Sequence, residues 1–297
     1  MTRDASDWQK EYGRAEQAPI EGPPFERAPA EREGAERPLT VMVFAPTAEA
    51  RDAYRRLLIR ETVVSVPTWP LAVTLGSQVD CAVVAVPPSA VFDAAGAIHA
   101  LREEHPALPV VYAADDVLRA RDQVERARIA HEVIRYGGAG ATVSAAIQAA
   151  CTAALLERTA AQLHEAGGVP SALQAALVRL CASEPPPRAV AELAGGVPVH
   201  RRTLWYQWRQ HVGAAPLRLE DVVAWVLLLR ASILRLRGSS WTEAATALGV
   251  HRHTVARAAE RLADTRLPRG TGDLTRHHAA ALRQRFVSKV LTPILRY

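Results

Sequence analysis

The fold is decided by the stretch LTVMVFAPTAEARDAYRRLLIRETVVSV at residues 39–66, where a β-branched run, a helix-like run and a second β-branched run follow one another. The alternation continues through DCAVVAV (80–86), PVVYAA (109–114) and HEVIRY (131–136), with helix-like stretches between them. Short runs rich in Val and Ile favour buried strands, and regular alternation with helices favours a parallel sheet covered on both faces. Residues 38–165 therefore predict an α/β domain with right-handed crossovers.

The expected helices cover residues 48–60, 89–105, 116–130 and 141–166. Residues 67–79, between the second and third strands, are interpreted as a short connection. This element order is typical of the flavodoxin-like α/β class.

Residues 39–165 also resemble the receiver domain of two-component response regulators, and Pro109 stands where that family often has a proline. The resemblance implies an acidic pair after the first strand, a phosphoaccepting Asp at the end of the third and a Ser or Thr at the end of the fourth. Apolar residues occupy these places: Ala45, Pro46, Ala85, Val86, Ala113 and Ala114. Without clustered carboxylates there are no ligands for Mg²⁺, so we expect a pseudo-receiver without a phosphoacceptor pocket.

No catalytic arrangement is found in the sequence. The first strand-to-helix connection, APTAEA at 45–50, lacks the glycines of dinucleotide and phosphate loops. Asp115 and Asp116 follow the fourth strand and are interpreted as helix caps. We expect no enzymatic activity, no bound cofactor and no metal site. An α/β enzyme with a nucleic-acid-binding arm is the least favoured alternative.

The N-terminal segment, the apolar runs and the cysteine spacing predict a protein that stays inside the cell. Residues 1–37, rich in Pro, Glu, Arg and Ala, are interpreted as a disordered leader with no secretion signal. The longest apolar run, Val222–Leu229, is much shorter than the roughly 20 residues of a membrane span. We expect a cytoplasmic protein with no membrane partner. The three cysteines are widely spaced, which fits reduced, buried thiols: Cys81, Cys151 and Cys181.

Charge is distributed unevenly between the two halves of the chain. Residues 169–297 carry 19 Lys and Arg against 8 Asp and Glu, a net charge of +11, whereas residues 1–168 carry 17 against 23, a net charge of −6. A basic segment attached to a mildly acidic one suits binding to a phosphate backbone, because counterion release supplies much of the affinity for DNA.

The basic segment contains two candidate helix-turn-helix units. In WTEAATALGVHRHTVARAAERL (241–262), Ala245 is the small contact residue and Gly249 makes the turn. Apolar residues predict the packing between its helices: Ala244, Leu248, Val250, Val255, Ala258 and Leu262. The earlier copy, LAGGVPVHRRTLWYQWRQHVG (193–213), places Leu204 and Trp208 toward the core and has Pro198 where glycine usually turns the chain.

Residues 169–268 resemble the tandem helix-turn-helix domain of the AraC/XylS family of transcriptional regulators. In that family a long helix joins the two units, and eight residues stand in its characteristic places: Trp208, Arg209, Gly213, Pro216, Arg230, Ala231, Leu234 and Leu236. The chain departs from the family at Pro198, at Ala259, where an aromatic is expected, and in the ending TRLPRG (265–270). The resemblance implies two recognition helices that enter successive major-groove segments on one face of DNA.

The exposed faces of these two helices supply the candidate DNA contacts. Arg202 suits a guanine edge, and Trp205 or Tyr206 suits thymine methyl groups or sugars. Four arginines are better placed for phosphates: Arg201, Arg209, Arg252 and Arg261. The remaining candidates are His200, His251, His253, Thr254 and Arg257. No Cys or acidic residue lies at ligand spacing from the histidines, so we expect no metal there.

The expected partner is double-stranded DNA, with RNA polymerase as a further candidate and the nucleoid as the site of action. We also expect a homodimer formed through the α/β domain, for which the apolar stretch Ala141–Leu163 offers a surface. Residues 269–297 predict a further basic helix, whose role stays open. The main alternative is a protein-interaction adaptor with degenerate helix-turn-helix units.

Overall fold

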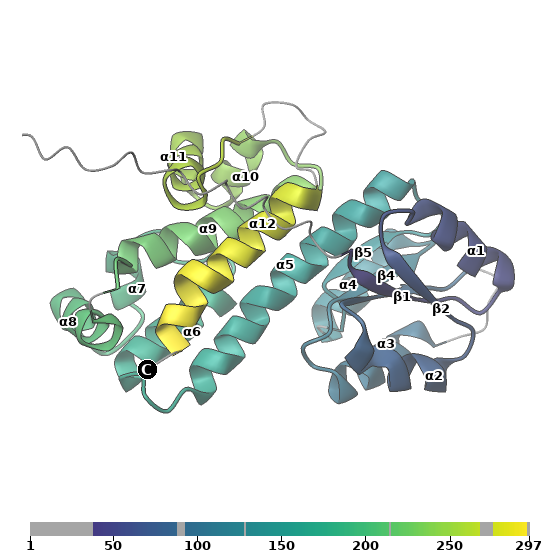
Figure 1. Ribbon diagram of the computed structural model, residues 1–297, viewed down its shortest axis with the longest axis horizontal. Helices are drawn as coiled ribbons and strands as arrows, with labels where there is room; N and C mark the ends of the chain where they lie inside the picture. Colours follow the sequence, from purple (N-terminus) through teal and green to yellow (C-terminus); the bar gives the residue numbers. More distant parts are fainter. Residues whose placement is uncertain (1–37, 88–92, 128, 214, 268–275, 296–297) are drawn as a thin grey trace, which may run out of the picture. The chain divides into compact units, whose positions relative to one another are not determined.

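The structure, a computed structural model, describes residues 38–87, 93–127, 129–213, 215–267 and 276–295 (Figure 1). Residues 38–297 form one compact unit. The predicted leader, residues 1–37, lies outside the described residues.

The first part of the unit is built on a five-stranded sheet. Its strands are β1 (Thr40–Phe44), β2 (Thr62–Val66), β3 (Cys81–Ala85), β4 (Val110–Ala114) and β5 (Glu132–Arg135). They are hydrogen-bonded in the order β2-β1-β3-β4-β5, and every neighbouring pair is parallel. The predicted α/β class, with a parallel sheet followed by a helical part, is confirmed.

Five helices cover this sheet: α1 (Ala48–Leu57), α2 (Trp69–Leu75), α3 (Ala94–Glu104), α4 (Val117–Ala127) and α5 (Gly140–Glu165). Because successive side chains of a strand point to opposite faces, the sheet contributes to two cores. One core joins the sheet to α1 and α5, and the other joins it to α2, α3 and α4. Helix α2 and the short 3₁₀ turn Gly76–Gln78 lie in the segment interpreted as a connection, so that interpretation was wrong.

Helix α5 belongs to two hydrophobic cores at once. Val143, Ile147 and Ala150 pack in the sheet core, whereas Leu156 and Leu163 pack in the core of the helical part. The apolar stretch Ala141–Leu163 is therefore covered within the chain, and its prediction as a pairing surface was wrong. The helix is long and apolar enough to cross a membrane, but 61% of its most apolar window is buried against the rest of the chain, as in a core helix.

A charged cluster fixes the middle of α5 to the sheet part. The Glu157 carboxylate accepts a hydrogen bond from Arg102 of α3 at 3.0 Å and lies 3.2 Å from Nε2 of the buried His131. Burial alone would raise the pKa of Glu157, but the hydrogen bond and charge of His131, followed by those of Arg102, lower it to about 2. Glu157 therefore stays ionised and paired.

The helical part contains the remaining helices: α6 (Ser171–Ala182), α7 (Val190–Ala194), α8 (Arg201–Val212), α9 (Leu219–Leu236), α10 (Trp241–Ala247), α11 (Arg252–Ala263), α12 (Arg276–Phe286), the π-helical turn Val287–Leu291 and α13 (Thr292–Leu295). Helix α9 is buried along most of its length, and its Trp225 packs edge-on against Phe286 of α12, with ring centroids 6.2 Å apart. Helix α12 contacts both α5 and α9, and Figure 1 shows it beside them. The basic helix predicted near the C-terminus is thus part of the helical core.

An ion pair links the end of α9 to the sheet. The buried carboxylate of Glu132 on β5 accepts hydrogen bonds from Arg237, with Nη2 to Oε1 at 2.8 Å and Nε to Oε1 at 2.9 Å. Burial raises the pKa of Glu132, and the charge of Arg237 acts in the opposite direction. The arginine is needed to keep a carboxylate at this position charged.

We expect Arg237→Ala to lower the free energy of unfolding by about 1–3 kcal/mol at neutral pH, because it leaves Glu132 buried without a partner while Arg237 itself is half exposed. A carboxyl whose folded-state pKa is raised binds protons more readily when folded, so the loss should shrink as the pH falls toward about 4. Urea unfolding at several pH values measures both effects. Arg56→Ala, at an exposed site on α1, is the control, and Glu132→Gln in the Arg237→Ala background should restore much of the loss.

Candidate nucleic-acid interface

The second helix pair, α10 and α11, is held together by a capped start and a tight turn. The Ser240 hydroxyl accepts from the Glu243 backbone N–H at 3.2 Å, and the Glu243 carboxylate accepts from the Ser240 N–H at 2.6 Å. These hydrogen bonds lower the pKa of Glu243 and fix the first turn of α10. Gly249 turns the chain with φ +67°, a conformation that L side chains rarely adopt.

The packing between α10 and α11 follows the predicted pattern. Ala245, the predicted small contact residue, is buried where the two helices meet. The other predicted positions pack in the same core: Ala244, Leu248, Val250, Val255, Ala258 and Leu262. Ala259, where the sequence departs from the expected aromatic, is also buried.

The first helix pair, α7 and α8, is joined by the longer connection 195–200, which contains Pro198. Leu204 and Trp208 of α8 face the core as predicted, and the Trp208 indole N–H donates to the Leu217 carbonyl at 3.0 Å. The chain thus reverses direction at this connection without a glycine in the left-handed region.

Both pairs begin their second helix in the same way. The sequence Val-His-Arg occurs at 199–201 and again at 250–252, and the histidine is the N-cap residue each time. Nδ1 of His200 accepts from the Arg202 backbone N–H, and Nδ1 of His251 accepts from the His253 N–H, both at 3.3 Å. Each cap satisfies a backbone donor that the helix leaves unpaired. The two pairs therefore present equivalent helix starts.

All twelve residues selected from the sequence are exposed: His200, Arg201, Arg202, Trp205, Tyr206, Arg209, His251, Arg252, His253, Thr254, Arg257 and Arg261. They lie on α8 and α11 or at the N-caps of these helices, so the structure groups them into two surfaces. We call these surfaces the α8 face and the α11 face.

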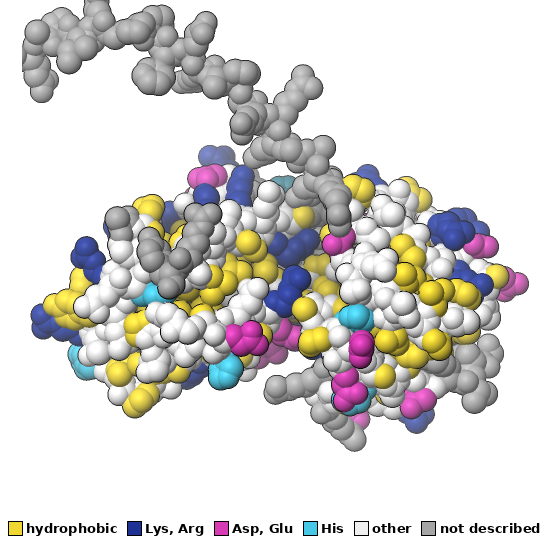
Figure 2. All heavy atoms as spheres, turned by 60° about the horizontal axis from the view of Figure 1, so that its bottom comes forward, with side chains coloured by type: hydrophobic (Ala, Val, Ile, Leu, Met, Phe, Trp, Pro, Cys, Tyr) yellow, Lys and Arg dark blue, Asp and Glu magenta, His cyan; other side chains and the backbone are white. Residues whose placement is uncertain are grey.

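The α8 face is an aromatic and arginine cluster. The Trp205 and Tyr206 rings meet edge-on with centroids 5.4 Å apart. Trp205 is 39% exposed and Tyr206 is 49% exposed. The Arg209 guanidinium carbon lies 5.1 Å from the Trp205 ring centroid, and that of Arg202 lies 5.8 Å from the Tyr206 ring centroid. Figure 2 shows Lys and Arg side chains beside hydrophobic ones at its left end, where α8 lies in Figure 1. These cation–π contacts hold two guanidinium groups and two rings on one exposed surface.

The α11 face has no aromatic residue other than histidine. His251 and His253 stack with ring centroids 5.0 Å apart and an interplanar angle of 19°. Arg252 and Arg257 are exposed, whereas Arg261 forms an ion pair with Asp221 of α9. Arg261 therefore ties α11 to α9, and any contact it makes to a phosphate would compete with this pair.

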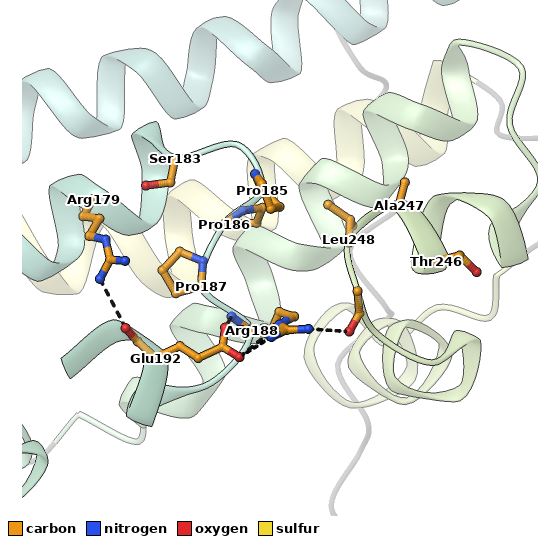
Figure 3. Close-up of a pocket in the computed structure, with 11 residues that line it drawn as sticks. Arg179, Ser183, Pro185, Pro186, Pro187, Arg188, Glu192, Thr246, Ala247 and Leu248 are labelled. Atoms are coloured by element: carbon orange, nitrogen blue, oxygen red, sulfur yellow. Dashed lines mark hydrogen bonds and ion pairs between the residues drawn. The ribbon is translucent and has the colours of Figure 1, made fainter. Parts of the chain in front are cut away.

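Two arginines outside the predicted contacts hold α7 in place, and one of them, Arg188, also connects the two helix pairs. Arg188, just before α7, donates to the Glu192 carboxylate at 2.7 Å and to the Gly249 carbonyl at 3.3 Å. Arg179 of α6 donates to the Glu192 carbonyl at 3.2 Å. Together with Pro185, they line a cleft of about 380 Å³ between α7 and the turn before α11 (Figure 3). The spacing of Arg188 and Glu192 is a local i, i+4 pattern that the sequence displays. The contacts of Arg188 with Gly249 and of Arg179 with Glu192 join residues farther apart in the chain, so no local pattern indicates them.

The C-terminal segment holds the ends of α8 and α11. Nε2 of the buried His211, near the end of α8, lies 2.9 Å from the Ile294 carbonyl oxygen. The Lys289 ammonium donates to the Leu262 carbonyl at 3.1 Å and to the Asp264 carboxylate at 3.3 Å, at the end of α11. Both exposed faces are thus carried by helices whose C-terminal ends are fixed.

No protein-family model and no curated protein matches this chain. Within the part of the chain that the structure describes, no three His, Cys, Asp or Glu side chains lie close enough together to hold a metal ion.

We expect Gly249→Ala to destabilise the protein by about 1–2 kcal/mol, because a side chain at φ +67° is strained and its Cβ would lie 2.8 Å from Arg188 Nη1. Gly195→Ala is the matched control, since Gly195 has a helical conformation and only ordinary contacts at the Cβ position. Thermal and urea unfolding measure the difference. Equal stability of the two variants would show that the turn tolerates a side chain.

Proposed function

We propose that this protein is a sequence-specific DNA-binding transcriptional regulator in which α7–α8 and α10–α11 act as two helix-turn-helix units. The observation that carries the proposal is the pair of equivalent helix starts at His200 and His251, each followed by an exposed basic face. Both faces belong to the segment with a net charge of +11. Helix α9 corresponds to the linker helix of the AraC/XylS arrangement.

The α8 face is the principal reader of sequence in this proposal. Arg202 donates to the edge of a guanine, and Trp205 or Tyr206 contacts thymine methyl groups or sugars. Arg201, Arg209 and the corresponding Arg252 bind phosphates and set the register on the duplex. The α11 face contributes fewer base contacts in this proposal because it has no Trp or Tyr and its Arg261 is paired with Asp221.

The α/β part acts as a regulatory or dimerisation module without phosphotransfer and without enzymatic activity. The strand order β2-β1-β3-β4-β5 is that of flavodoxin-like and receiver domains, which supports the resemblance. The residues at its strand ends are the buried Ala45, Ala85 and Ala114, and the Arg51 guanidinium donates to the Ala45 carbonyl at 2.8 Å. Asp116 caps α4 through the Arg119 N–H at 3.0 Å, which supports its interpretation as a cap.

In this proposal the protein acts in the cytoplasm on duplex DNA, and a homodimer forms through a surface of the α/β part other than the buried stretch of α5. RNA polymerase is a further proposed partner. The exposed Trp205 and Tyr206 would also suit a protein partner, which keeps an adaptor as the second candidate function. Salt dependence separates the two functions, because each phosphate contact makes the slope of log affinity against log salt more negative by about 0.9.

We expect the full-length protein to select a consensus from random duplex DNA, and its affinity for that site to fall steeply with salt. The full chain is required because a fragment beginning at Val169 would lose Leu156 and Leu163 from the helical core. Site selection followed by fluorescence anisotropy measures both properties. A folded protein that enriches no sequence and shows no affinity at low salt would exclude this function.

Arg202→Ala should cost about 1–3 kcal/mol of binding free energy on the selected site and relax the preference at one base pair. Arg209→Ala should weaken selected and random duplexes alike, because phosphate contacts carry no sequence information. Arg56→Ala, an exposed arginine on α1, should leave both affinities unchanged. If Arg202→Ala and Arg209→Ala lose affinity equally on both duplexes, the assignment of the α8 face is wrong.

A further inference from the structure

Two of the three cysteines lie in the same hydrophobic core. Cys81 is the first residue of β3 and Cys151 lies in the middle of α5, and both belong to the core that joins the sheet to α1 and α5. Each thiol affects the pKa of the other, and both are free thiols in the reduced form. Cys181, on α6, is buried in the other core.

A cleft of about 460 Å³ leads to one of the two thiols. It lies at the amino-terminal edge of the sheet, where Leu39 precedes β1, Asp80 precedes β3 and Pro109 precedes β4. Cys151 lines this cleft, whereas Cys81 does not. A small solute that enters the cleft therefore reaches Cys151 first.

Two arginines lie at the same place. Arg158, on α5, lines the cleft, and so does Arg283 of α12, which donates to the Gln148 side-chain carbonyl at 2.8 Å and to the Thr152 hydroxyl at 3.2 Å. These hydrogen bonds hold the Arg283 guanidinium against the turns of α5 that flank Cys151. A fixed positive charge next to a thiol favours the thiolate.

The surroundings of the two thiols shift their pKa values in opposite directions. The pKa of Cys151 is lowered by its hydrogen bond with Cys81 and, against the effect of burial, by Arg283 and Arg158. The pKa of Cys81 is raised by the same hydrogen bond and by burial. Asp80 raises both values, but for Cys151 the two arginines and the hydrogen bond outweigh it. Burial raises the pKa of the Cys181 thiol to about 12, so it is the least reactive of the three.

We propose that Cys151 and Cys81 form a peroxide-sensitive dithiol, in which Cys151 is the reacting thiol and Cys81 the resolving one. The Cys151 thiolate attacks hydrogen peroxide, so that an S–O bond forms, the O–O bond breaks and the leaving hydroxide takes a proton to become water. The Cys81 sulfur then attacks Sγ of the Cys151 sulfenic acid, so that the S–S bond forms, the S–O bond breaks and hydroxide leaves with the Cys81 proton as water. Two thiols are oxidised to one disulfide, and one peroxide is reduced to two waters.

The test is to treat the reduced, folded, full-length protein with hydrogen peroxide, alkylate the remaining thiols in denaturant and map the peptides by mass spectrometry. We expect the loss of two of the three thiols, one intramolecular cross-link between the peptides of Cys81 and Cys151, and full alkylation of Cys181. Cys181→Ala is the matched control and should form the same cross-link.

The single variants separate the two roles. In Cys81→Ala, Cys151 should stop at the sulfenic acid and be trapped by dimedone, whereas in Cys151→Ala the Cys81 thiol should stay reduced. The wild type and Cys181→Ala decide the proposal even if a core variant fails to fold. Three free thiols in the wild type at peroxide doses that oxidise free cysteine in the same buffer would overturn it. The proposal would also be overturned by oxidation of Cys181 in preference to Cys151, or by a cross-link only between two chains.

Discussion

Helix α5 is buried at both ends in different hydrophobic cores, and the arrangement of the rest of the chain depends on this burial. Its first half covers the sheet beside α1, and its second half packs against α6, α9 and α12. Burying apolar surface is the main favourable contribution to folding, so residues that serve both cores resist any separation of the sheet from the helices. Glu157, in the second half of the helix, adds a charged contact with Arg102 and His131 of the sheet part.

The two exposed faces are carried by short helices that the core holds from behind. Helix α9 supports α11, because it packs against that helix and receives Arg261 at Asp221, whereas α8 packs against α6, α7 and α13. Arg188 connects α7 to the turn before α11, and the C-terminal segment fixes the far ends of α8 and α11. Binding surfaces built on rigid elements lose less conformational entropy when they bind, so this arrangement suits the proposed reading of DNA.

The proposed regulatory role of the α/β part does not involve phosphotransfer. Ala45, Ala85 and Ala114 are buried at the carboxyl edge of the sheet, whereas the opposite edge holds a cleft with two arginines and a cysteine. Arg283 connects this cleft to α12, whose continuation reaches the ends of both exposed helices through Lys289 and Ile294. The fold thus contains a continuous path of contacts from the sheet to the α8 and α11 faces.

Most helices and strands could be predicted from local sequence patterns, because hydrophobic periodicity and turn residues act over a few neighbouring positions. The sequence predicted the five strands, the buried set of α10–α11, the turn at Gly249 and the exposure of the twelve selected residues. It missed α2, since TWPLAVTLGSQ carries a proline and is too short for a clear helical period. Three features became visible only in the folded chain: α5 is covered by other elements, Arg188 donates to the Gly249 carbonyl, and Cys81 and Cys151 lie in one core. Each of these depends on residues distant in sequence, and such contacts are set by how the layers pack, which no local pattern encodes.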